Sequence, residues 1–248
     1  MEDSKKLAIS FLAYGEEHIE ELKNILKDLE THKTKFDFFI TTNDKSNFCL
    51  YNVTETNLPF NYNLKRFPIK SALLNYDSVL FIDTDHTFKK DNLDLNFIDE
   101  LEDGIYVNWV DTVDGIKYEN IITLEDFING KIKTEIGNDY FNRLNDLNYG
   151  KKEISFIRES FFLIKIKDKD KKYKFIENWD IITNQMNFNT LSNNGIGIME
   201  GMIVYLTCSN IGLKINEIKN NKKLLKFFNG FNHIGDKNLK GIVNKKLF

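Results

Sequence analysis

The stretch Ser78–Asp91, SVLFIDTDHTFKKD, decides the fold of this 248-residue chain. Its apolar run, Val79–Ile82, is typical of a short strand buried on both faces. Asp83 and Asp85 follow where such a strand should reach solvent. Residues two apart in a strand point to the same side, so we expect both carboxylates to face one site. Two like charges held together are costly unless a cation or a shared proton compensates them.

The segments before this stretch predict a β-α-β order, which favours a largely parallel sheet with helices on its faces. We expect strands at Leu7–Ala13, Phe36–Thr41 and Phe48–Val53, and helices at Glu16–Leu29 and Phe67–Asn75. Ligands of such sheets bind beyond the carboxyl ends of the strands. Tyr14, Asp44 and the acid pair all follow predicted strands. This convergence predicts a ligand site at one edge of the sheet.

The second half of the chain predicts fewer regular elements. We expect strands at Gly104–Val110 and Phe156–Ile166, a helix at Asp170–Met186, a turn at Asn193–Gly197 and an apolar helix at Met199–Cys208. The polar segment 111–150 has no clear period and is a candidate acceptor or specificity surface. We predict one α/β domain over 1–248. Within it, three segments differ in character: 1–110, 111–213 and the lysine-rich segment 214–248.

Composition narrows the function classes. The net charge of −3 gives no global basic field for nucleic acid. Cys49 and Cys208 are isolated, without metal-ligand spacing, and indicate a reducing compartment. The start is polar, and no apolar run approaches the roughly 20 residues that cross a bilayer. We therefore expect a cytoplasmic protein with no integral membrane segment.

The order of these parts resembles the GT-A glycosyltransferases, especially family 8, the group of glycogenin and bacterial galactosyltransferases. In that group a hydrophobic strand ends in D-x-D, as LFIDTD does at Leu80–Asp85. A preceding helix carries a basic residue toward the nucleotide, and RFPIKSALLNYDS is similar to that segment. The group also has a His-x-x-Gly-x-x-Lys motif near its C-terminus. Here His233–Lys237, HIGDK, is a shorter version without the following Pro-Trp.

The resemblance implies a single GT-A-like (Rossmann-like) domain that transfers a sugar from a UDP-sugar with Mn²⁺ or Mg²⁺. In that domain, 1–110 would bind the nucleotide, 111–213 would face the acceptor, and the lysine-rich segment 214–248 would close on the donor. The metal ligands it implies are Asp83, Asp85 and His233, an oxygen-and-imidazole set that suits Mn²⁺. It implies these contacts to the donor: Tyr14 near the uracil, Asp44 and Asp83 at the base or ribose, Arg66 and Lys70 at the nucleotide, and Lys237 at the diphosphate.

The catalytic acid on the acceptor side stays open between Glu200, which opens the predicted apolar helix, and Glu159, next to Arg158 on a predicted strand. Plain structural roles are helix-dipole complementarity for Glu200 and an ion pair for Glu159. The resemblance leans toward retention of anomeric configuration. The acceptor can be a glycan, a lipid, a protein or a modified nucleic-acid base, and the sequence does not choose.

Two other functions fit the acid pair. Asp83–Thr87 matches the D-x-D-x-T/V motif of haloacid-dehalogenase-like phosphatases, in which Asp83 would be the nucleophile and Asp85 the general acid. Those enzymes carry the motif on an early strand and need a later acid pair, whereas Asp236 has Lys240 four residues on. The third interpretation is a nucleotide-binding module without catalysis. Plain alternatives for individual residues also exist: a packed turn aromatic for Tyr14, a solvated helix face for Arg66 and Lys70, and a surface position for His233.

Overall fold

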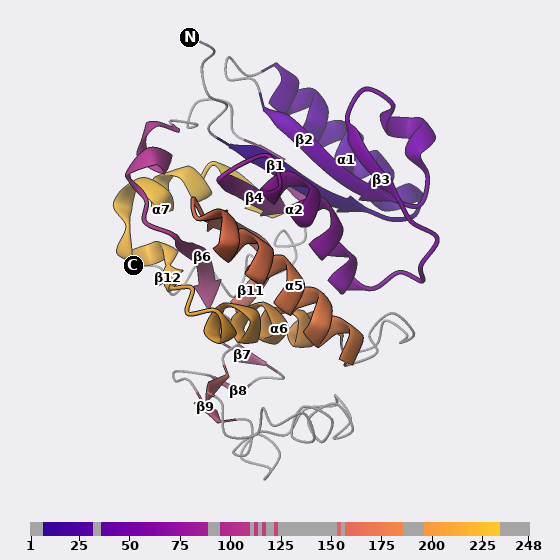
Figure 1. Ribbon diagram of the computed structural model, residues 1–248. Coiled ribbons are helices and arrows are strands. Elements are labelled where there is room, and N and C mark those ends of the chain that lie inside the picture. The colour runs from indigo at the N-terminus through magenta and orange to yellow at the C-terminus, as the bar shows by residue number, and fades with distance from the viewer. Residues whose placement is uncertain are drawn as a thin grey trace. The chain divides into compact units, whose positions relative to one another are not determined.

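A computed structural model of the chain describes residues 7–31, 36–88, 95–109, 112–113, 116–117, 122–123, 153–154, 157–185 and 196–233. The fold is α/β (Figure 1). The chain divides into two compact units. The first gathers the described residues of 1–56, 67–101 and 218–248, and the second those of 57–66 and 102–217. The C-terminal part of the chain thus returns to the N-terminal unit.

The first unit contains a four-stranded parallel sheet in the order β4-β1-β2-β3. Its strands are β1 (Ala8–Ala13), β2 (Asp37–Thr42), β3 (Asn52–Glu55) and β4 (Ser78–Ile82). Every residue of β1 and β4 is buried. Apolar side chains on both sides of a strand need cover on both faces, and the two helices of the crossovers supply it.

Helix α1 (Glu16–Glu30) connects β1 to β2, and α2 (Arg66–Leu73) leads from β3 back to β4. The two crossovers run in opposite directions along the sheet, so right-handed connections place these helices on opposite faces. Helix α1 buries one apolar stripe, Ile19, Leu22, Ile25, Leu26 and Leu29. On the other face, the hydroxyl of Ser10 in β1 donates to the carbonyl of Pro68 in α2 at 3.3 Å.

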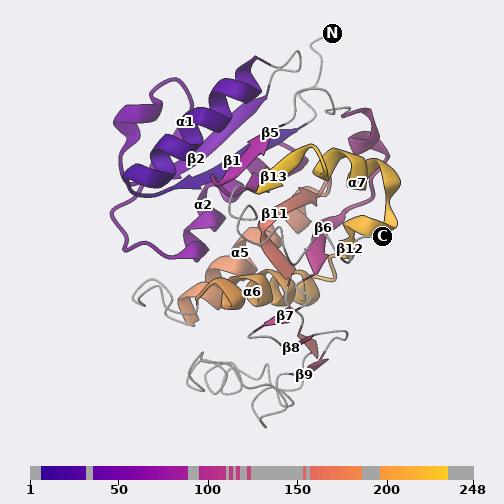
Figure 2. The ribbon, with the colours of Figure 1, turned by 180° about the vertical axis from the view of Figure 1, so that it is seen from behind.

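The C-terminal segment adds a second small sheet to the first unit. Strand β13 (Phe231–His233) pairs antiparallel with β5 (His86–Phe88), which follows the acidic turn directly (Figure 2). Helix α7 (Lys222–Phe228) precedes β13, and its Phe227 ring lies 5.5 Å from that of Phe97 in η3 (Asn96–Glu100). The short helices η1 (Lys45–Phe48) and η6 (Ile218–Asn220) complete this unit.

In the second unit, β6 (Gly104–Trp109) pairs antiparallel with β11 (Ile157–Lys165) and parallel with β12 (Ile215–Glu217). Helices α5 (Lys169–Gln185) and α6 (Ile196–Asn210) pack against each other, and α6 also contacts β11 and η2 (Tyr62–Lys65). Four short strands form two pairs: β7 (Thr112–Val113) with β8 (Ile116–Lys117), and β9 (Ile122–Thr123) with β10 (Glu153–Ile154).

Among the seven longer sheet strands of the two units, four described pairings are parallel and one is antiparallel. The predicted class, a mixed and mostly parallel α/β sheet flanked by helices, is therefore confirmed. The predicted strand at Phe48–Val53 is wrong in position, since Lys45–Phe48 forms η1 and β3 begins at Asn52. Within the described ranges, no helix combines the length and apolar character that crossing a bilayer requires.

Candidate functional site

Three parallel strands of the first unit end at one edge of the sheet, and polar residues follow each of them. Ala13 of β1 is in register with Thr42 of β2, and β4 runs parallel beside β1. The loops after β1 and β2 touch, because the amide of Gly15 donates to Asn43 Oδ1 at 2.9 Å. Gly15 has a φ of 83°, a conformation that a residue with a side chain rarely adopts. Half-buried Tyr14 therefore sits in a tightly defined turn at this edge.

The acid pair also lies at this edge, but in a turn and not in a strand. Strand β4 ends at Ile82, Thr84 and Asp85 form a turn, and β5 begins at His86. The expectation that strand alternation aligns the two carboxylates is therefore wrong. Asp83 and Asp85 are nevertheless both half-exposed, and 32% of the Asp85 side chain is accessible to solvent.

The ring of His86 closes the turn from the following strand. Its Nδ1 lies 3.0 Å from the carbonyl oxygen of Asp83 and 3.1 Å from Asp85 Oδ1. Both neighbours are hydrogen-bond acceptors, so Nδ1 carries a proton and donates. His86 is buried, and the hydrogen bond from its Nδ1 goes to the Asp83 carbonyl, while Oδ1 of Asp85 lies close beside the ring. The local signal for His86 was present in the sequence, directly after the acid pair, but its role in shaping the turn was not predicted.

Strand β13 brings His233, the first residue of the C-terminal motif, next to the acidic turn. In the β5–β13 ladder, His233 is the register partner of His86, the residue that follows Asp85. The Cα atoms of directly opposed residues in an antiparallel pair of strands lie about 4.5–5.5 Å apart. More than 140 positions of sequence separate Asp85 from His233, and two short strands place them at one end of one ladder. Lys237 lies outside the described residues.

Asp44 follows β2 and caps η1. Its Oδ1 accepts from the Ser46 amide at 3.0 Å and from the Ser46 hydroxyl at 2.6 Å, and its Oδ2 accepts from Asn47 Nδ2 at 2.9 Å. These bonds, above all the one from the Ser46 hydroxyl, lower the pKa of Asp44 below its ordinary value. Asp44 is at the predicted edge, with its carboxylate engaged by its own loop.

Arg66 begins α2 and is 5% exposed, so its interpretation as part of a solvated helix face is wrong. Its Nε donates to Asp180 Oδ1 at 3.1 Å, and its Nη1 donates to the carbonyl of Asn63 at 2.9 Å. Burial lowers the pKa of the Arg66 guanidinium, and the charge of Asp180 opposes that effect. Lys70, four residues along α2, is half-buried.

The two candidate catalytic residues lie on elements of the second unit. Glu159 is in β11 and Glu200 is in α6, and these elements contact each other. Helix α6 begins at Ile196, so the expectation that Glu200 opens the helix is wrong. The side chains of Glu159 and Glu200 are not among those that the structure describes.

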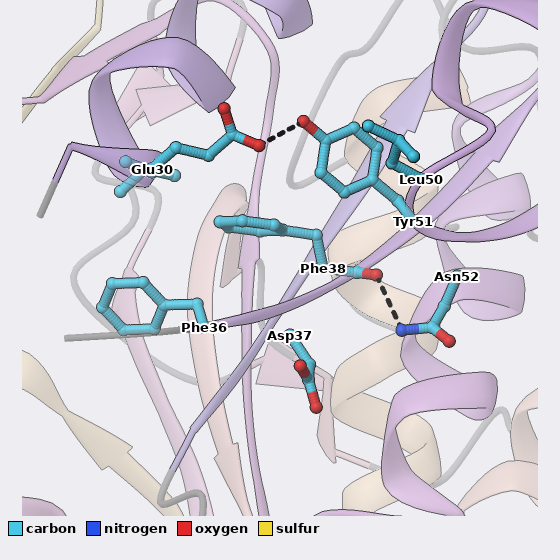
Figure 3. Close-up of a pocket in the computed structure, with 8 residues that line it drawn as sticks. Glu30, Phe36, Asp37, Phe38, Leu50, Tyr51 and Asn52 are labelled. Carbon is cyan, nitrogen blue, oxygen red and sulfur yellow. Dashed lines mark hydrogen bonds between the residues drawn. The ribbon is translucent and has the colours of Figure 1, made fainter.

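A pocket of about 330 Å³ lies at the opposite edge of the first unit's sheet, at the amino ends of β2 and β3 (Figure 3). Its lining residues are Leu29, Glu30, Phe36, Asp37, Phe38, Leu50, Tyr51 and Asn52. The polar groups satisfy one another or nearby groups: Tyr51 donates to Glu30 at 2.5 Å, Asn52 to the carbonyl of Phe38 at 3.2 Å, and Tyr76 to Asp37. Burial and the bond to Glu30 raise the pKa of Tyr51 to about 12. We assign no ligand to this pocket.

The oxygen and nitrogen donors near the acidic turn bear on metal binding. Within the described side chains, no group of three His, Cys, Asp or Glu residues has a metal-binding arrangement. The imidazole of His233 lies outside the side chains that the structure describes. Two half-exposed carboxylates and a histidine at the adjacent register position match the oxygen and nitrogen ligands of Mn²⁺. The residues at this edge of the sheet thus fit such an ion by type and position.

No family model matches the chain, and the search of curated proteins gave no significant match.

Proposed function

We propose that the protein is a metal-dependent glycosyltransferase of GT-A type that takes its sugar from a uridine diphosphate sugar. The observation that carries the proposal is the register of β5 and β13, in which His233 lies opposite the residue that follows Asp85. An acidic turn alone is weak evidence for a metal site. The same turn paired with the strand that carries His233, the first residue of HIGDK, is the combination expected for a metal–diphosphate site.

In this proposal Asp83, Asp85 and His233 hold Mn²⁺ or Mg²⁺ at the carboxyl edge of the sheet. A cation there neutralises the charge that develops on the departing diphosphate. Since Oδ1 of Asp85 is directed to His86, we expect its other oxygen to meet the metal. We also propose that the sugar nucleotide is contacted by Tyr14, Lys70 and Lys237.

The observed contacts of Asp44 and Arg66 limit how these two residues could interact with the nucleotide. Both oxygens of Asp44 accept bonds within η1, so a contact to base or ribose would share an oxygen with Ser46 or Asn47. Arg66 is buried against Asp180, which suits a fixed positive charge near the nucleotide better than a mobile one. Glu159 and Glu200 remain the two proposals for the acid on the acceptor side, with retention as the expected stereochemistry.

The direct test is calorimetric titration of UDP into the full chain, with Mn²⁺ and with EDTA. We expect binding that depends on Mn²⁺ and that Asp85→Ala abolishes. Asp170→Ala, which removes an exposed carboxylate of α5, is the matched control and should bind as the wild type does. Metal-independent binding, or binding retained in Asp85→Ala, would count against the proposal.

Measurements of substrate turnover distinguish the glycosyltransferase from the phosphatase and from the binding module. Release of UDP from a panel of UDP-sugars supports transfer or hydrolysis of the donor. A phosphatase would instead hydrolyse a small phosphomonoester with Mg²⁺ and lose that activity in Asp83→Asn. Mn²⁺-dependent UDP binding without release of UDP from any UDP-sugar would indicate a binding module.

A further inference from the structure

The residue between the two aspartates is tied to helix α1. Thr84 is 3% exposed, whereas Asp83 and Asp85 on either side are half-exposed. Its hydroxyl donates to Glu21 Oε2 at 2.8 Å. Nδ1 of His18, one helical turn before Glu21, lies 3.3 Å from the Thr84 hydroxyl and 3.0 Å from Glu21 Oε2. We call Thr84, Glu21 and His18 the turn anchor.

The hydrogen-bond roles in the turn anchor follow from the chemistry of its members. An ionised carboxylate only accepts, so the Thr84 hydroxyl must donate to Glu21. For the same reason Nδ1 of His18 carries a proton where it approaches Glu21 Oε2. Hydrogen bonds to a charged acceptor are stronger than neutral ones. The anchor is therefore a charge-assisted contact between residues 63 positions apart, and not a local loop bond.

The anchor acts on the turn from one side while His86 acts from the other. His86 meets Asp83 and Asp85 from β5, and Glu21 holds Thr84 from α1. With the central residue fixed and the following residue buried, the two aspartates have little freedom to move apart. Two carboxylates repel each other in the absence of a cation, and the contacts that restrain the turn oppose this repulsion.

We propose that Thr84, Glu21 and His18 are positioning residues that set the places of the Asp83 and Asp85 carboxylates for a divalent cation. The inference rests on the proposed function, because it concerns the same metal site. Partners that orient metal ligands without touching the metal are worth about 10–100-fold in metal affinity. The anchor should therefore govern cation affinity more than it governs folding.

The test compares paired variants by Mn²⁺-dependent UDP titration of the full chain. Thr84→Val removes the hydroxyl at nearly constant volume, and Thr84→Ser keeps it. We expect affinity about 10-fold weaker or more for Thr84→Val and within about 2-fold of wild type for Thr84→Ser. Glu21→Met should weaken binding in the same way, while Glu21→Gln, which keeps an acceptor oxygen, should weaken it less.

The double variant Thr84→Val/Glu21→Met tests whether the two residues affect cation affinity through the bond that joins them. Both changes remove one shared bond, so their effects on affinity should not add. Equal affinity of Thr84→Val and wild type overturns the inference and leaves the proposed function standing. Absence of Mn²⁺-dependent UDP binding in the wild type overturns both. If Thr84→Val fails to fold, as judged by circular dichroism, the Glu21→Met and Glu21→Gln pair decides by the same criteria.

Discussion

Asp44 illustrates how one carboxylate can organise the loop beyond a strand. It accepts two bonds from Ser46 and one from Asn47, and it begins η1 as the N-cap residue. The donors stabilise the ionised form and lower its pKa. A carboxylate with a depressed pKa contributes stability above its unfolded pKa, and this contribution is lost as the pH falls through the folded pKa. The cap is therefore weakened only in acid.

The Ser46 hydroxyl makes the largest contribution to this shift, and Asn47 a smaller one. We expect Ser46→Ala to raise the pKa of Asp44 toward its ordinary value, because the backbone bond remains but the hydroxyl bond is lost. Asn47→Ala should raise it less. The carboxyl ¹³C shift of Asp44, followed by NMR against pH, measures both changes. An unchanged pKa in Ser46→Ala would refute the capping account.

At the scale of single elements, Arg66 at the start of α2 and Asp180 in α5 form a buried ion pair within the second unit. Only 6% of the Arg66 side chain is exposed, against 31% for Asp180. Removing the carboxylate leaves a buried guanidinium with less compensation, although the Asn63 carbonyl still accepts from it. We expect Asp180→Ala to reduce the free energy of unfolding by about 2 kcal/mol.

Urea denaturation measures this change. Glu177→Ala, an exposed acid on the same helix, is the control and should change stability by less than about 0.5 kcal/mol. Equal stability of the two variants would mean that the Arg66–Asp180 pair contributes nothing net to the fold.

The β5–β13 ladder is the element on which the proposed site depends. A proline at position 232 cannot donate a backbone hydrogen bond and fixes its own φ, so Asn232→Pro should separate β13 from β5. We expect at least about a 10-fold loss of Mn²⁺-dependent UDP affinity, by analogy with other partners that orient metal ligands. Asn232→Ala keeps the amide and should bind normally. Calorimetry on the two variants makes the comparison, and equal affinities would exclude a role for this pairing.

Element positions were largely predictable because they depend on local pattern. The alternation of apolar runs with helical stripes predicted β1, α1, β2, α2 and β4 to within about two residues. The strand-end convergence of Tyr14, Asp44 and Asp83 followed from the parallel order and is confirmed. β3 was misplaced because Asp44 nucleates η1 through side-chain bonds that apolar spacing does not encode.

Over the whole molecule, the unpredicted features of the site are contacts between distant residues. Thr84 meets Glu21, and Arg66 meets Asp180 across 114 positions. No spacing in the sequence encodes such partners, because each pair is set by the tertiary packing of elements far apart in the sequence. The turn at Asp83–Asp85 was missed for a related reason, since the tie of Thr84 to α1 and the β5–β13 ladder fix it there.

The central claim is that a cation bound at the acidic turn, with His233 as a ligand, holds the nucleotide diphosphate. The most direct measurement is anomalous diffraction from crystals of the full chain soaked with UDP and Mn²⁺. The account predicts one manganese peak within bonding distance of Asp85 and His233 and of the diphosphate oxygens. Manganese bound elsewhere, or UDP bound with no metal beside Asp85, would contradict it.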